Sequence, residues 1–163
     1  MRITWRDDDI GRRTKVEVLA AVNDVFQRYR VPHTIAIMAA GLDERPDLVA
    51  LIKERGMLVQ LHCWTHEDLT RTEHRAQLPR AMDMAEQLFG VRPTVLYPPW
   101  NRSDRYLEEF AMQLGLTVSA AKISIEQYIR AGGDVAEDTV NFHHWHVPEA
   151  VLIEPALRIA TQR

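Results

Sequence analysis

The sequence predicts an α/β fold in which short buried strands alternate with amphipathic helices around a mostly parallel sheet. Apolar runs recur along the chain, and most are followed by a segment whose apolar residues repeat with helical spacing. The run at residues 33–40 is apolar on both faces, as in a central strand covered by helices. Alternation of this kind predicts βαβ units with parallel strands.

Length and composition predict one globular domain at residues 1–163, long enough for a core and short for a full eightfold barrel. The charge is nearly balanced, with 20 Lys+Arg, 23 Asp+Glu and a net charge of -3, so no nucleic-acid partner is expected. Cys63 is the only cysteine, which excludes an intrachain disulfide. We see no signal peptide and no apolar run approaching ~18 residues, so we expect no membrane partner and a cytoplasmic location. The oligomeric state stays open.

The first elements follow from apolar spacing. Ile3 and Trp5 alternate with polar residues, which predicts a strand at residues 1–6. Helical spacing of apolar residues then predicts a helix at 15–30, with Thr14 as its N-cap. Val31 and Pro32 end this helix, and the central strand follows.

The middle of the chain repeats the same rhythm. A helix is expected at residues 45–55, ended by Gly56, and the apolar run at 57–61 reads as a third strand. A longer helix is expected at 72–89, followed by a short strand at 94–97. Two prolines then predict a rigid loop.

The last third predicts three further helices and two strands. In chain order they are a helix at 103–114, a strand at 116–120, a weaker helix at 123–131, a strand at 139–142 and a terminal helix at 148–159.

Residues that can bind metal or move protons follow several of these strands. Asp7, Asp8 and Asp9 follow the first, the histidine pair His62 and His66 follows the third, and three histidines follow the last: His143, His144 and His146. In a parallel sheet these strand ends lie on one rim. One carboxylate with two imidazoles leaves open coordination positions, as in catalytic zinc sites. His33, at the opposite end of its strand, is expected to be structural.

Four segments resemble the motifs of one family, the polysaccharide deacetylases of carbohydrate esterase family 4, with their NodB homology domain. His62-Cys63-Trp64-Thr65-His66 resembles the family's H-(S/T)-x-x-H metal motif, and Arg6-Asp7-Asp8-Asp9 its first, aspartate motif. Tyr97-Pro98-Pro99-Trp100-Asn101 is similar to its R-x-P-x-G loop, and Phe142-His143-His144 to its late histidine strand. The resemblance implies an irregular, shortened (β/α) barrel.

The resemblance also implies the metal ligands and the base. Asp9, His62 and His66 would bind a divalent metal, most often zinc in this family, and Asp8 would be the general base. If the aspartate motif begins one residue earlier, the base and ligand are Asp7 and Asp8 instead. We prefer Asp8 and Asp9, because Ile3 and Trp5 already fill the apolar positions of the strand.

Further roles follow from the same resemblance. His144 is the first choice for the acid that protonates the leaving amine, His143 the second and His146 the third. The proline loop, with Pro99, Trp100 and Asn101, would contact the substrate, and the backbone N–H of Trp100 would hold the oxyanion.

Two positions depart from the family pattern. Tyr97 stands where the family has arginine, and we expect Arg6 to supply that positive charge to the base from the first strand. Asn101 replaces the loop glycine, and asparagine also adopts left-handed backbone conformations.

The implied reaction is hydrolysis of an acetyl group, N-acetyl rather than O-acetyl, from a sugar or polysaccharide. Two other functions stay open at this point. One is a barrel without turnover that binds glycans or serves as a scaffold, through Trp64, Trp100 and Trp145. The other is a metal hydrolase of a small amide that is not a glycan.

Overall fold

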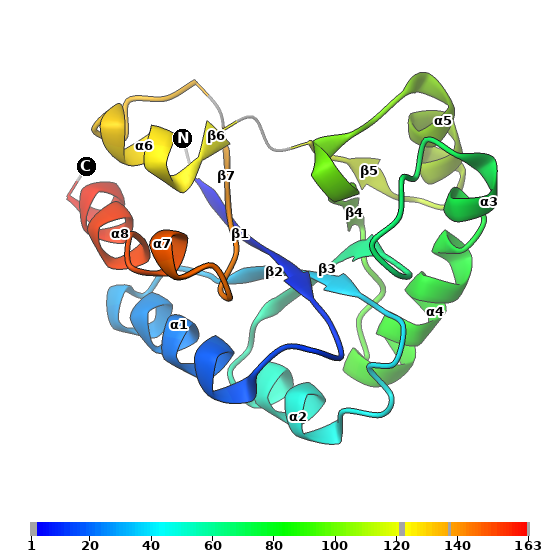
Figure 1. Cartoon of the computed structure of the whole chain (residues 1–163), viewed down its shortest axis with the longest axis horizontal. Coiled ribbons are helices and arrows are strands. Elements are labelled where there is room, and N and C mark those ends of the chain that lie inside the picture. Colours follow the sequence, from blue (N-terminus) through cyan, green and yellow to red (C-terminus); the bar gives the residue numbers. More distant parts are fainter. Residues whose placement is uncertain (1–2, 121–122, 137, 163) are drawn as a thin grey trace.

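The computed structural model describes residues 3–120, 123–136 and 138–162. Its strands are all parallel and form one sheet in the order β5-β4-β3-β2-β1-β7-β6. They are β1 (Thr4–Ile10), β2 (Thr34–Met38), β3 (Leu58–Cys63), β4 (Val95–Leu96), β5 (Thr117–Val118), β6 (Ile123–Ser124) and β7 (Thr139–Phe142). The sheet curls through the centre of the molecule as a half-barrel, with helices around its outer side (Figure 1). The expected irregular α/β barrel is confirmed.

The helices follow the predicted alternation. They are α1 (Val16–Tyr29), α2 (Pro46–Glu54), α3 (Thr72–Arg75), α4 (Leu78–Phe89), α5 (Arg105–Gln113), α6 (Ile125–Arg130), α7 (Val147–Ala150) and α8 (Ile153–Thr161), with a 3-10 turn at Pro99–Asn101. Within the described residues, no helix is both long enough and apolar enough to cross a bilayer.

Two helices that the sequence predicts as continuous are each broken in two. The helix at 72–89 divides into α3 and α4, because Pro79 has no N–H to bond the carbonyl of Arg75. The terminal helix divides into α7 and α8, since Pro155 likewise cannot bond the carbonyl of Val151.

Two smaller expectations are also wrong. The weak helix at 123–131 begins with the two-residue strand β6, and only α6 is helical. The N-cap of α1 is Lys15, without a side-chain cap, because the Thr14 hydroxyl instead accepts a hydrogen bond from the Gly11 N–H at 3.0 Å.

The core consists of two groups of buried side chains that hold the curled sheet against its helices. One group is aromatic and joins β1, β7, α1 and α6, with Trp5 edge-on to Tyr128 and Phe26 stacked on Phe142. The other is mainly aliphatic and packs β2 and β3 against α2 and α4. Burial of this kind contributes about 25 cal/mol for each Å² of apolar surface removed from water. The strands that carry the polar clusters are therefore anchored to the helices by these two groups.

The aspartates lie inside β1, whereas the sequence predicts that this strand ends at Arg6. Against β2, Asp7 pairs with Ile35 and Ile10 with Ile37, so β1 carries one extra residue between these two pairs. Asp9 has a φ of 65°, a left-handed conformation that also occurs in G1-type β-bulges. The bulge interrupts the strict alternation of side chains, and the Asp9 carboxylate reaches past β2 to the histidines at the end of β3.

Candidate metal centre and active site

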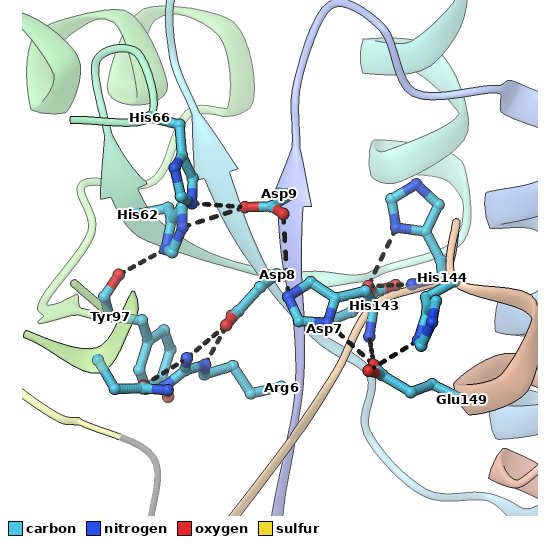
Figure 2. Close-up of polar contacts among 12 residues, drawn as sticks. Arg6, Asp7, Asp8, Asp9, His62, His66, Tyr97, His143, His144 and Glu149 are labelled. Carbon is cyan, nitrogen blue, oxygen red and sulfur yellow. Dashed lines mark hydrogen bonds and ion pairs between the residues drawn. The ribbon is translucent and has the colours of Figure 1, made fainter. Parts of the chain in front are cut away.

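Asp9, His62 and His66 form a candidate metal centre at the carboxyl ends of β1 and β3. Each offers one ligand atom, and these atoms all lie within 4.8 Å of one another. The Nε2 atoms of His62 and His66 lie 3.2 and 3.3 Å from the Asp9 Oδ1 (Figure 2). A carboxylate and two imidazoles are a donor set that suits a divalent ion and leaves positions for water and substrate.

Within the described part of the chain, two ligand atoms of this centre are buried without a hydrogen-bond partner, namely the Asp9 Oδ1 and the His62 Nε2. Buried polar atoms are nearly always paired, so an unpaired carboxylate oxygen facing an unpaired imidazole nitrogen fits a cation between them. The Nδ1 of His62 is 2.6 Å from the carbonyl oxygen of Tyr97. This contact makes Nδ1 the protonated nitrogen and leaves the Nε2 lone pair for the metal. The residues present therefore fit the divalent ion that the family motif implies.

The pKa of Asp9 lies below its ordinary value. Burial by itself raises this pKa, but the imidazoles of His62 and His66 beside the carboxylate lower it by more. Asp9 is therefore a carboxylate across the neutral pH range, as a metal ligand must be.

Asp8 is held by Arg6 rather than by the histidine pair. The Arg6 Nε donates to the Asp8 Oδ1 at 2.6 Å, and a second guanidinium nitrogen contacts the Asp8 Oδ2, so the pair is bidentate. Both residues are buried. The guanidinium also lies over the Tyr97 ring at 4.7 Å and donates to the Asn101 Oδ1 at 2.9 Å. Arg6 thus places a positive charge beside Asp8, and Tyr97 packs against the guanidinium.

Asp7 has a third set of partners, away from the metal centre. Its Oδ1 accepts hydrogen bonds from the backbone N–H and the Nδ1 of His144, at 2.9 and 3.0 Å. Its Oδ2 lies 3.2 Å from the Nε2 of His33, and all three residues are buried. Burial raises the pKa of Asp7, but the hydrogen bonds from His144 and His33 lower it by more. Asp7 therefore stays ionised. The three adjacent aspartates therefore face three different partners, and only Asp9 meets the histidine pair.

His143 is the late histidine that lies nearest to the metal centre. Its Nε2 is 3.8 Å from the Asp9 Oδ2, and its Nδ1 is 2.9 Å from the Glu149 Oε2. In Figure 2 the contacts of His143 lead to Asp9 and Glu149, whereas those of His144 lead to Asp7. The third histidine, His146, binds the other Glu149 oxygen at 2.9 Å and is half-exposed.

Glu149 raises the pKa of His143. Burial lowers the pKa of His143, but the hydrogen bond and the charge of Glu149 raise it by more, with smaller contributions from Asp8 and Asp9. The imidazole is thereby kept protonated to a higher pH than an ordinary histidine, which suits a proton donor.

Replacing Glu149 by glutamine is expected to shift the alkaline limb of the pH dependence of kcat to lower pH. From the sequence, one of the late histidines is expected to act as the acid. Such an acid must be protonated, and without the Glu149 charge His143 loses its proton at lower pH. The measurement is a pH series of acetate release for wild type and Glu149→Gln, with His146→Gln as the control for the other Glu149 contact. An alkaline limb that stays in place in Glu149→Gln would contradict this role.

The proline loop lies beside the metal centre. Trp100 and Asn101 both have left-handed backbones, with φ of 53° and 54°, which is ordinary for asparagine and strained for tryptophan. The expectation that Asn101 substitutes for the loop glycine through this conformation is met. The Trp100 ring is 56% exposed and stands edge-on to His66, at 4.4 Å between centroids. Pro99 is buried beneath the turn.

Two contacts escaped the sequence analysis. Glu149 was not expected, because it lies in a helix six residues after His143 and only the intervening turn brings it back. His33 was expected to be structural. It is buried, but it also contacts the carboxylate of Asp7, whose other oxygen binds His144. For the contact between His33 and Asp7, the only signal in the sequence was that Asp7 belongs to a run of three aspartates.

A curled parallel sheet with one carboxylate and two imidazoles at its carboxyl edge defines an α/β protein with a candidate catalytic-type metal centre. The family model "Polysaccharide deacetylase" matches residues 3–119. The chain belongs to the polysaccharide deacetylase family, also known as carbohydrate esterase family 4 or NodB.

Two of the curated relatives are named as deacetylases of chitin or of chitooligosaccharides. Over 129 residues the chain is 26% identical to chitin deacetylase 1 of Cryptococcus neoformans, covering 76% of this chain and 26% of that protein. Over 123 residues it is 28% identical to a chitooligosaccharide deacetylase of Rhizobium leguminosarum, covering 72% of this chain and 56% of that protein. The chain thus spans between about a quarter and just over half of the length of these relatives.

Solved structures share the fold over almost the whole chain. A family 4 carbohydrate esterase from Streptomyces lividans, in complex with acetate, superposes with a TM-score of 0.81 at 16% identity, covering 99% of this chain and 88% of that one. A family 4 pseudoenzyme from Bacillus anthracis gives a TM-score of 0.81 at 13% identity, covering 98% and 62%. At these identities the likeness shows the fold alone, and the same fold occurs in a protein named as an esterase and in one named as a pseudoenzyme.

Proposed function

We propose that the chain is a metal-dependent deacetylase that removes acetyl groups, N-acetyl rather than O-acetyl, from a sugar or glycan. The observation that carries this proposal is the meeting of Asp9, His62 and His66 with two buried, unpaired ligand atoms, flanked by Asp8 and His143. The names of the curated relatives, chitin deacetylase 1 and chitooligosaccharide deacetylase, support the removal of acetyl groups from a glycan.

Asp9, His62 and His66 would hold the divalent ion, for which we propose zinc. The chemistry that such an ion supplies when bound is polarisation of the acetyl carbonyl and a lower pKa for bound water. The Tyr97 carbonyl fixes the His62 ring, and the bulge in β1 fixes Asp9, so the chain holds these donors ready before the ion binds.

The proton transfers are assigned to Asp8 and His143. Asp8, aligned by Arg6, takes the proton from the attacking water, and His143 donates a proton to the departing amine nitrogen. The geometry favours His143 over His144, the first choice from sequence, because the Nε2 of His143 lies 3.8 Å from the Asp9 Oδ2, whereas the Nδ1 of His144 is bound to Asp7. His144 remains the second candidate. The N–H of Trp100 is assigned to the oxyanion, with Pro99 and Asn101 shaping the loop.

Arg6→Ala is expected to lower turnover on the order of 10²-fold while metal affinity stays near the wild-type value, because Arg6 orients Asp8 and contacts no metal ligand. The buried Asp8 loses its partner, so the free energy of unfolding should fall by about 3–5 kcal/mol. Arg6→Lys is the matched variant: it keeps the charge without the bidentate fork. Acetate release and metal titration are measured on folded protein, and parallel loss of both would count against this role.

The proposed function is tested by a panel of acetylated compounds. Metal-loaded protein is incubated with N-acetylated chito-oligosaccharides, O-acetylated xylan oligosaccharides and a small non-glycan amide such as acetanilide, and acetate is quantified. We expect release from the chito-oligosaccharides and its loss on chelation. Release from acetanilide alone would favour the small-amide hydrolase instead.

A second candidate is a glycan-binding member without turnover. Trp100 and Trp145 are 56% and 55% exposed and lie next to His66 and His143, where they can stack on sugar rings. Stoichiometric metal and chito-oligosaccharide binding without acetate release would favour this reading over the deacetylase.

A further inference from the structure

A cavity of about 680 Å³ opens directly beside the metal centre. Its lining includes Asp9 and His66 of the centre, and it extends over the start of α1 towards α7. The volume lies within the range of small-molecule sites, about 300–1,000 Å³. A substrate whose acetyl group lies at the centre would therefore place another part of itself in this cavity.

The walls of the cavity are largely apolar. Val18 comes from α1, Met38 from the end of β2, and Trp145 and Val147 from the segment after β7. Trp145 is 55% exposed, so its ring is available to a ligand. An indole beside aliphatic side chains suits the apolar face of a sugar ring.

Two cations line the same cavity, Arg13 and Lys15. Both are exposed, and within the described part of the chain neither has a carboxylate in ion-pair contact. The nearby Arg45 differs, because it is paired with Asp47 at 2.8 Å. The one carboxylate among the lining residues is Asp9, which belongs to the metal centre. The cavity thus combines an apolar wall with two positive charges that form no ion pair within the described chain.

We propose that this cavity selects acetylated amino sugars that carry a negatively charged substituent, a carboxylate or a phosphate, which Arg13 and Lys15 bind. This inference rests on the proposed function and narrows its substrate class. The sugar ring would lie against Trp145, and the charged substituent would reach the start of α1. Because both cations are exposed and screened by solvent, the preference over a neutral sugar should be about five- to twenty-fold at low salt.

The test compares three sugars: neutral N-acetylglucosamine, N-acetylmuramic acid with its carboxylate, and N-acetylglucosamine 1-phosphate. Dissociation constants are measured by ligand-observed NMR titration on metal-loaded protein, both wild type and Asp8→Asn, so that binding is read independently of turnover. We expect at least one anionic sugar to bind about five- to twenty-fold more tightly than the neutral one, and the preference to shrink as salt is added. The tighter of the two anions identifies the charged group.

Two double variants separate this site from a general charge effect. R13Q/K15Q should lose the preference for the anion, whereas K53Q/R130Q, which removes the same charge from exposed positions outside the cavity lining, should keep it. Equal affinities in wild type, no binding of any sugar, or an unchanged preference in R13Q/K15Q would overturn the inference. Acetate release without a preference for the anion would contradict only this inference. Anion-selective binding without acetate release would contradict only the proposed function.

Discussion

His62→Ala is expected to abolish stoichiometric metal binding and to reduce acetate release to the background of the assay. His62 is the more buried of the two histidine ligands. The Tyr97 carbonyl fixes its ring so that Nε2 faces Asp9. Without this imidazole only Asp9 and the partly exposed His66 remain, too few donors to hold an ion in place of its water. Metal content after dialysis, measured by mass spectrometry, checks this result.

The control for this substitution is His74→Ala, which removes a histidine outside the metal centre. The His74 Nδ1 contacts only the carbonyl of Asp68 among the bonds of the described chain. We expect His74→Ala to keep one ion per chain and most of the activity. If His62→Ala keeps its ion and its turnover, the centre is not where we place it.

Asp8→Asn is expected to lower kcat by about 10²–10⁴-fold while the protein still binds one metal ion. Asparagine keeps the shape of the side chain and one oxygen for Arg6, but it cannot accept the proton of the attacking water. Because Asp8 is not in the group of Asp9, His62 and His66, metal affinity should change little. The measurements are steady-state acetate release and metal titration on the same preparation.

Asp7→Asn decides between the two registers of the aspartate motif. Asp7 is as buried as Asp8, and it holds His144 and His33. We expect it to cost stability and to lower turnover of the folded, metal-loaded protein less than Asp8→Asn does. The reverse order would make Asp7 the base and Asp8 the ligand, and thermal unfolding of each variant separates misfolding from lost chemistry.

Much of the fold was predictable, because burial of apolar side chains sets the periods of strands and helices. The run at 33–40 became the central strand β2, and the polar clusters at the ends of β1, β3 and β7 do meet at one edge. The breaks that sequence analysis missed come from single backbone groups. Pro79 and Pro155 each remove one hydrogen bond, which apolar spacing does not register.

The site was predictable as a set of residues but not as a set of pairs. The histidine spacing predicted the candidate metal centre, and the missing loop arginine pointed to Arg6, which does contact Asp8. The bulge at Asp9 could not be foreseen, since it depends on how β1 registers against β2. The choice between His143 and His144 likewise depends on Glu149 and Asp7, whose contacts arise only when distant elements pack.

The account is tested most directly by a crystal structure of the metal-loaded protein with acetate. We predict one ion bound by Asp9 and by the Nε2 atoms of His62 and His66, at about 2.0–2.2 Å, with acetate beside it within reach of Asp8 and His143. An ion held by Asp7 or Asp8, or no ion at this edge of the sheet, would contradict the assignment of the site.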